Sequence, residues 1–155
     1  MKKLIIICPA YNEADKLPKL IDEFKKSNYL DNLFVVNSGS IDNSENILIQ
    51  NNVEHISLPV NKGGGYAIIK GIEHALNNDF EICCIIAGNG KMDPQEITKL
   101  IEKIEIENYD FVQGSRYLDN EMNYLPTFRR IMIPFVTNLY SKIFKVKFTD
   151  ATCGF

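Results

Sequence analysis

Short apolar runs alternate along the chain with segments whose apolar residues recur at helical spacing. Runs that are rich in β-branched residues and end in polar turns are typical of strands buried on both faces of a parallel sheet. The predicted strands cover residues 4–8, 32–36, 54–58, 80–87 and 110–113. The predicted helices cover residues 15–26, 42–51, 66–77, 93–107 and 128–144. This order predicts an α/β fold with a mainly parallel central sheet, built as one domain over residues 1–155.

Local signals add detail at several helices. The segment from Asp42 to Glu45 has the form of a capping box, which predicts a helix start. Asp93 followed by Pro94 combines a capping residue with proline at the first helical position. Pro134 falls inside the last predicted helix and is expected to interrupt or kink it.

Composition and charge narrow the class of protein. The formal net charge is -3, whereas a nucleic-acid-binding protein needs a basic stripe, so no nucleic-acid partner is expected. The four cysteines lack zinc-site spacing, and three of them lie in or beside apolar runs, which favours buried reduced thiols. No apolar run has the length of a membrane span, and no signal peptide precedes the first strand, so a cytoplasmic location is expected.

Polar loops follow the predicted strands. Doubly wound sheets bind ligands in the crevice beyond the carboxyl ends of their strands. The loops are residues 9–13 (PAYNE), 37–42 (NSGSID), 61–65 (NKGGG), 87–94 (AGNGKMDP) and 114–117 (GSRY). The sequence therefore predicts that these loops converge on one cleft.

Two of these loops carry groups suited to a nucleotide. The ring of Tyr11 can stack on a base, and the carboxylate of Glu13 can accept hydrogen bonds from ribose; the alternative is a turn followed by an acid at a helix start. Lys62 and the glycines at 63–65 open a helix whose free amides favour phosphate. The chain has neither a P-loop nor the dinucleotide-binding glycine pattern after its first strand.

Taken in order, the loops resemble those of the family 2 glycosyltransferases, particularly the dolichol- and polyprenyl-phosphate sugar transferases. PAYNE and GSRY match that family as they stand, NSGSID matches DDGSTD, and NKGGGYA matches NxGKGxA. GNGKMDP falls where the family writes ADGQxDP, and DATCGF at 150–155 is similar to DxxCGF. The resemblance implies the GT-A nucleotide-sugar fold and sugar transfer from a nucleotide-diphosphate donor of the UDP or GDP type.

The resemblance also implies a set of site residues. The nucleotide-sugar-binding residues would be Pro9, Ala10, Tyr11, Glu13, Asn37, Ser38, Lys62, Gly63, Gly65, Gly88, Asn89 and Lys91. In the polyprenyl-phosphate branch, arginines at the GSR motif and at the start of the following helix bind phosphate. The matching residues are Arg116 and the pair Arg129-Arg130, of which Arg116 and Arg130 are the candidates on the catalytic side.

Two departures concern charge. The family's paired acids after the second strand are Asn37 and Ser38 here, and its metal-binding DxD is Ala87-Gly88-Asn89. The family implies Mg²⁺ or Mn²⁺, but both carboxylates are gone and a neutral amide is a poor substitute. We therefore expect nucleotide binding that depends little on metal. Either Lys91 replaces part of the cation's charge, helped by Lys62 and Arg116, or it is a solvated loop residue.

The last predicted helix has a broad apolar face, which is either core or a membrane-contacting surface with cations towards lipid phosphates. The second reading fits a lipid-phosphate acceptor and a peripheral position at the inner membrane face. The chain stops at Phe155, where family members continue towards the acceptor side, so either it is trimmed there or its acceptor site is incomplete.

Two functions remain open. The first is sugar transfer with inversion by direct displacement, and the second is a nucleotide-sugar-binding or scaffold module that kept the fold and lost catalysis. The loop 87–91 separates them, because nucleotide affinity without turnover would favour the second. A nucleotidyltransferase is disfavoured, because the glycine-rich first loop of that class is absent.

Overall fold

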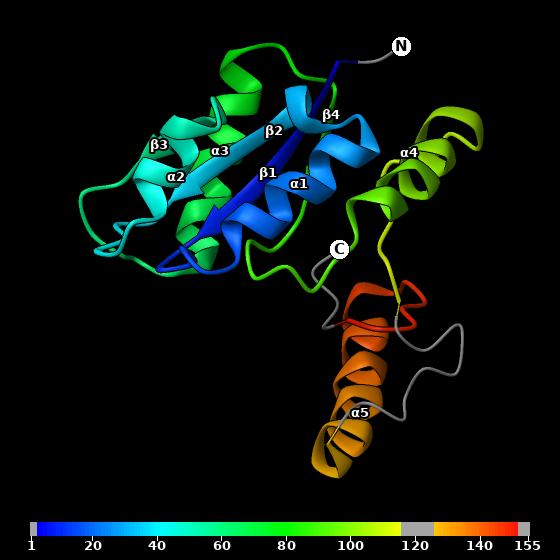
Figure 1. Ribbon diagram of the computed structural model, residues 1–155. Coiled ribbons are helices and arrows are strands. Elements are labelled where there is room, and N and C mark those ends of the chain that lie inside the picture. The colour runs from blue at the N-terminus through cyan, green and yellow to red at the C-terminus, as the bar shows by residue number, and fades with distance from the viewer. Residues whose placement is uncertain (1–2, 116–125, 152–155) are drawn as a thin grey trace. The chain divides into compact units, whose positions relative to one another are not determined.

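The computed structural model describes residues 3–115 and 126–151. The chain divides into two compact units, residues 1–109 and 110–155 (Figure 1). The first unit contains the sheet and the loops of interest, and the second contains the last helix. The prediction of one domain over the whole chain stays a prediction.

The first unit is a parallel α/β sheet, as predicted. Its strands are β1 (Leu4–Ala10), β2 (Leu33–Asn37), β3 (Glu54–Ser57) and β4 (Ile82–Ile85). All pair in parallel, in the order β3-β2-β1-β4. The helices are α1 (Leu17–Ser27), α2 (Ser44–Gln50), α3 (Gly64–Asn77) and α4 (Ile97–Ile106), with short 3-10 turns at Leu30–Asn32 and Pro94–Glu96. Figure 1 shows α1 and α3 on opposite faces of the sheet.

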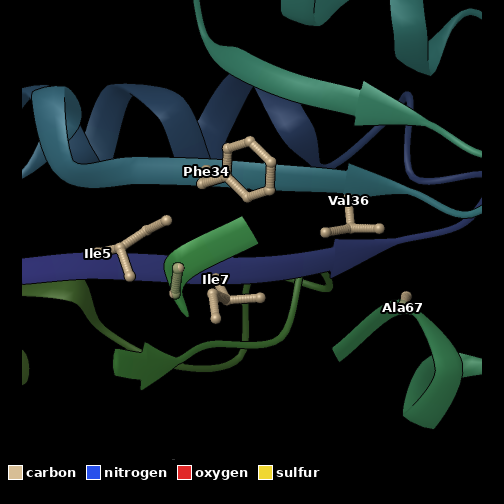
Figure 2. Packing of buried hydrophobic residues seen from close by; sticks show 6 residues of the cluster. Ile5, Ile7, Phe34, Val36 and Ala67 are labelled. Atoms are coloured by element: carbon tan, nitrogen blue, oxygen red, sulfur yellow. The ribbon is translucent and has the colours of Figure 1, made fainter. Parts of the chain in front are cut away.

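The core against α3 follows from the two-residue period of the strands. Alternate residues of β1 and β2 point to one face, and they form a buried cluster with alanines of α3 (Figure 2). The members are Ile5, Ile7, Phe34, Val36, Ala67 and Ala75. Gly71 of α3 lies close to Ile7. A Cβ added at position 71 would be only 2.3 Å from Ile7 Cγ2. The missing side chain thus lets the helix approach the central strand closely.

The opposite face is covered by α1, an amphipathic helix. Leu17, Leu20, Ile21 and Phe24 recur at helical spacing, and each is at most 1% exposed. Pro18 sits in the first turn, where the missing N–H costs no hydrogen bond. These features confirm the helix predicted from the same periodicity, although it begins at Leu17 rather than at residue 15.

Two local predictions are wrong. Residues 110–115 contain no strand, and Phe111 is 68% exposed. The run at 110–113 has only two apolar residues between Asp110 and Gln113, which is too little apolar surface to secure a strand on both faces. The capping box also fails to form: Glu45 Oε1 accepts from the Ser57 hydroxyl, 2.6 Å away, rather than reaching back to the start of α2.

The start of α4 agrees with its predicted cap. Asp93 Oδ1 accepts a hydrogen bond from the backbone N–H of Gln95 at 2.9 Å. Pro94 follows at the first position of the 3-10 turn that leads into the helix. The carboxylate of Asp93 is therefore engaged with the helix start.

The second unit is built on α5 (Thr127–Phe144), which runs through Pro134 without interruption. The chain then returns along one face of this helix. The Thr137 hydroxyl accepts from the N–H of Ala151 at 3.1 Å, and the Ser141 hydroxyl accepts from the N–H of Phe148 at 3.1 Å. Within the described ranges, no helix combines the length and the apolar character needed to cross a bilayer.

Candidate functional site

The loops that leave β1, β2, β3 and β4 meet at the carboxyl edge of the sheet. The N–H of Ser38 donates to Ala10 O at 2.8 Å, and the N–H of Gly88 donates to Pro9 O at 3.3 Å. The end of β1 is therefore bonded to the loops on both sides of it. From β1 the chain adds β2 and β3 on one side and then β4 on the other side. The strand order therefore reverses between β1 and β4, which is where doubly wound sheets bind ligands.

The second and third loops touch through Gly39. Its φ is +68°, and a Cβ there would lie 2.6 Å from the carbonyl carbon of Val60 and 2.7 Å from the backbone nitrogen of Asn61. Any larger residue would push these two backbones apart and would also strain its own. Glycine at this position fixes the distance between the NSGSID and NKGGG loops.

The first loop is held by side chains of the second. The N–H groups of Asn12, Glu13 and Ala14 donate in turn to Ser40 Oγ at 2.9 Å, Ser44 Oγ at 3.0 Å and Asp42 Oδ2 at 3.0 Å. In return, Asn12 Oδ1 accepts from the N–H of Ile41 at 2.9 Å. The sequence analysis did not identify these partners as site-forming. Their signal is the cluster of short polar side chains after β2, a residue type that often bonds to nearby backbone.

Asp42 is ionised in this arrangement. Burial opposes its charged form, but hydrogen bonds from Ser44 and from the N–H of Ala14 outweigh that effect and lower the pKa of the carboxyl group. The N–H of Ala14 donates to Oδ2 and the N–H of Ser44 donates to Oδ1, and the negative charge of the carboxylate strengthens both hydrogen bonds. The hydrogen bond of Asp42 that joins the two loops is therefore present at neutral pH.

Asn37 and Ser38, which replace the family's paired acids, point into the protein. Each is only 2% exposed. Asn37 donates through Nδ2 to Ser57 Oγ at 3.0 Å and accepts through Oδ1 from the N–H of Ser40 at 3.2 Å. Ser38 donates to Asn61 Oδ1 at 3.3 Å. Both side chains thus bond within the loops, and their role as nucleotide ligands stays a prediction.

The third loop forms a turn ahead of α3. Asn61 Oδ1 accepts from the N–H of Gly63 at 2.7 Å, and Gly63 has a φ of +89°. A Cβ at Gly63 or Gly65 would meet no atom within 4 Å, so the backbone here is open to a ligand. The ammonium of Lys62 lies 5.0 Å from the centre of the Tyr66 ring. Lys62, Gly63 and Gly65 were predicted as site residues, whereas the bridging Asn61 was not.

The loop after β4 lies in close contact with the end of β1. A Cβ at Gly88 would lie 3.0 Å from Pro9 O and 3.2 Å from Ala10 Cβ. Beyond it, Asn89 Oδ1 accepts from the N–H of Lys91 at 3.1 Å, and Gly90 turns the chain with a φ of +68°. Among the described residues, no cluster of three His, Cys, Asp or Glu side chains is placed to hold a metal ion. The loop does not fit a metal site of the two-aspartate kind.

The remaining candidates differ in their surroundings. Tyr11 is 43% exposed directly after β1, which leaves its ring available for stacking. The Glu13 carboxylate accepts from Lys16 Nζ at 2.5 Å, so it is already paired. Arg130 is exposed near the start of α5 in the second unit, and Arg116 lies outside the described residues. Their predicted phosphate-binding roles are untested.

Cys8 is the buried nucleophilic group nearest to this edge. Burial, helped by the negative charge of Glu13, raises the pKa of its thiol to about 12. The thiol is protonated at neutral pH and is fully enclosed in β1. Cys8 is therefore a structural residue, as the sequence indicated. Cys84 is also buried, but Cys83 is exposed, so the expectation of a buried thiol is wrong there.

Comparison with known proteins adds named relatives. The chain is 29% identical over 132 residues to the UDP-N-acetylglucosamine--dolichyl-phosphate N-acetylglucosaminyltransferase of Methanococcus voltae, covering 74% of this chain and 52% of the relative. It is 24% identical to the polyprenol monophosphomannose synthase of Mycolicibacterium smegmatis, covering 99% of this chain and 60% of the relative. The chain thus spans between about half and two thirds of the length of these relatives.

A solved structure confirms the fold. Glucosyl-3-phosphoglycerate synthase of Mycobacterium tuberculosis, in complex with Mn²⁺, UDP and glucosyl-3-phosphoglycerate, superposes with a TM-score of 0.66 at 21% identity. The alignment covers 99% of this chain and 55% of that one. The fold is GT-A. Residues 5–155 match the family model described as glycosyl transferase family 2, so the chain belongs to that family.

Proposed function

We propose that this chain binds a nucleotide-diphosphate sugar at the carboxyl edge of its sheet and transfers the sugar to a polyprenyl phosphate. The observation that carries the proposal is the set of four loops bonded around the end of β1 at the topological switch point. The names of the two relatives supply the substrate classes, a UDP sugar as donor and a dolichyl or polyprenol phosphate as acceptor.

Different residues of the site would bind the base and the diphosphate of the donor. Tyr11 would stack on the base, and the open backbone at 63–65 with Lys62 would face negative charge. Gly88 keeps the β4 loop close enough to the end of β1 for one ligand to touch both. A phosphate oxygen of the acceptor would displace the nucleotide diphosphate at the sugar carbon with inversion. Because that oxygen is already ionised, the step needs no strong general base.

The second unit supports a lipid acceptor through the surface of α5. Six of its exposed apolar residues share one face of the helix: Phe128, Ile131, Met132, Phe135, Leu139 and Ile143. Residues 126–149 carry five cations and no acid, whereas the rest of the chain has 12 Lys and Arg against 20 Asp and Glu. An apolar stripe flanked by cations suits a helix lying in the interface of an anionic membrane.

Vesicle binding tests the membrane role of α5. We expect the protein to co-sediment with vesicles containing phosphatidylglycerol and much less with pure phosphatidylcholine. Phe135→Glu should weaken binding by about tenfold or more, because the variant places a charge where the exposed aromatic ring would enter the lipid. Phe111→Glu is the matched control, since Phe111 is 68% exposed and Phe135 is 65% exposed in the same unit. Equal loss in both variants, or no vesicle binding, would contradict the membrane role.

Calorimetric titration with UDP, GDP and their sugars tests the donor. We expect one nucleotide to bind with micromolar affinity, and Gly88→Val to weaken it by about tenfold or more, because valine would separate the β4 loop from Pro9 and Ala10. Circular dichroism must show that the variant is folded. The alternative function, a binding module without catalysis, is favoured by the missing carboxylates of the loop 87–91, and it predicts the same affinity with no sugar transfer.

A further inference from the structure

We infer that the donor diphosphate is neutralised by Lys91 in place of a divalent ion, so that nucleotide binding requires no metal. This inference deepens the proposed function and rests on it. The family resemblance implies a divalent ion held by two aspartates, whereas the loop 87–91 contains no carboxylate and one lysine.

The donor atoms of this loop are poor ligands for a hard cation. Mg²⁺ and Mn²⁺ prefer several oxygens, among them carboxylates. Ala87 has no side-chain donor, and the Asn89 oxygen already accepts from the N–H of Lys91 at 3.1 Å. The nearby carboxylate of Asp93 caps the next helix through the N–H of Gln95 at 2.9 Å. Each of these two oxygens is already engaged in a hydrogen bond that shapes the loop.

The same turn carries a cation, Lys91. Gly88 fixes the loop against the end of β1, and Gly90 reverses the chain through a positive φ. Lys91 follows three residues after Gly88, so the Cα atoms of the two residues are at most about 11 Å apart. Lys91 is exposed and forms no ion pair with another residue of the described ranges.

The net charge of the loop supports the replacement of a divalent ion by Lys91. Two aspartates and one divalent ion sum to zero, whereas this loop sums to +1 from Lys91 alone. The nearest acid of the first loop, Glu13, is paired with Lys16. The loop therefore presents at least as much positive charge to a diphosphate without a metal as a metal-loaded loop would. A free divalent ion, in contrast, meets a cation and no free carboxylate.

Calorimetry of UDP binding to the whole chain tests the inference. We expect the same dissociation constant in excess EDTA and in excess Mn²⁺. Lys91→Gln should weaken UDP by about tenfold or more in EDTA, while uridine binding stays unchanged because it lacks the diphosphate. Lys19→Gln is the control, since Lys19 lies on α1 with its side chain 78% exposed and should leave both affinities unchanged.

The outcomes separate the inference from the proposed function. UDP binding that requires Mn²⁺, or that is insensitive to Lys91→Gln, overturns the inference and leaves the proposed function standing. Absence of binding of any nucleotide in both buffers overturns the two together. The triple variant Ala87→Asp, Asn89→Asp, Lys91→Gln should gain Mn²⁺ binding that calorimetry detects without nucleotide. A triple variant without Mn²⁺ affinity would also count against our reading of the loop.

Discussion

Replacing Gly39 by alanine is expected to lower the free energy of unfolding by about 2–5 kcal/mol. Two costs add. Alanine is strained at a φ of +68°, and its Cβ would lie 2.6 Å from the carbonyl carbon of Val60. The obstructing atoms belong to backbone, so no side-chain rotation can relieve the contact. Because Gly39 sets the spacing of two loops at the predicted site, nucleotide affinity should fall as well.

Urea denaturation followed by circular dichroism measures this effect. Gly64→Ala is the matched control, because Gly64 lies in the first turn of α3 and a Cβ there meets nothing within 4 Å. That control should change stability by less than about 1 kcal/mol, in the stabilising direction. Equal stabilities of the two variants would show that the loops are not packed as described.

The contact between α3 and β1 leads to the second large effect. Ile7→Ala should cost about 2–5 kcal/mol, because it empties a fully buried site in the central strand. Gly71→Ala should cost about 1–3 kcal/mol, because the new methyl group would overlap Ile7 Cγ2. The double variant should cost less than the sum of the two, since removing Ile7 makes room for the methyl group at position 71.

A double-mutant cycle in urea measures this coupling. We expect an interaction free energy of about 1 kcal/mol or more between positions 7 and 71. Ile69 provides the control: it is 54% exposed on the same helix, so Ile69→Ala should cost less than about 0.5 kcal/mol. Strict additivity of the costs at positions 7 and 71 would contradict the close approach of α3 to β1.

The sequence predicts the sheet well where a strand is apolar on both faces. Leu4–Ala10 and Leu33–Asn37 occupy the middle of the sheet, and burial on both faces leaves a continuous apolar run. The segment 110–113 has only two adjacent apolar residues, so the strand predicted there does not form. The capping box was also mistaken, since the partner of Glu45 is Ser57, which is distant in sequence.

The candidate site could also be predicted only in part. Its location follows from topology, because parallel strands place their exits at one edge, and the loops of β1, β2 and β4 do meet there. The direction of individual side chains does not follow. Asn37 and Ser38 turn inward because Ser57 and Asn61 offer partners on the neighbouring loop, and these pairings depend on strand order and register. No single-loop pattern carries that information.

The central claim is that one nucleotide-diphosphate sugar binds where the loops of β1, β2, β3 and β4 meet. Amide chemical-shift mapping by NMR during titration with UDP tests it most directly. We expect the largest shifts in residues 10–12, 38–40, 61–65 and 88–91, with the amides of β3 and the distal end of α4 unaffected. Shifts confined to another part of the chain, or none at saturating UDP, would contradict it.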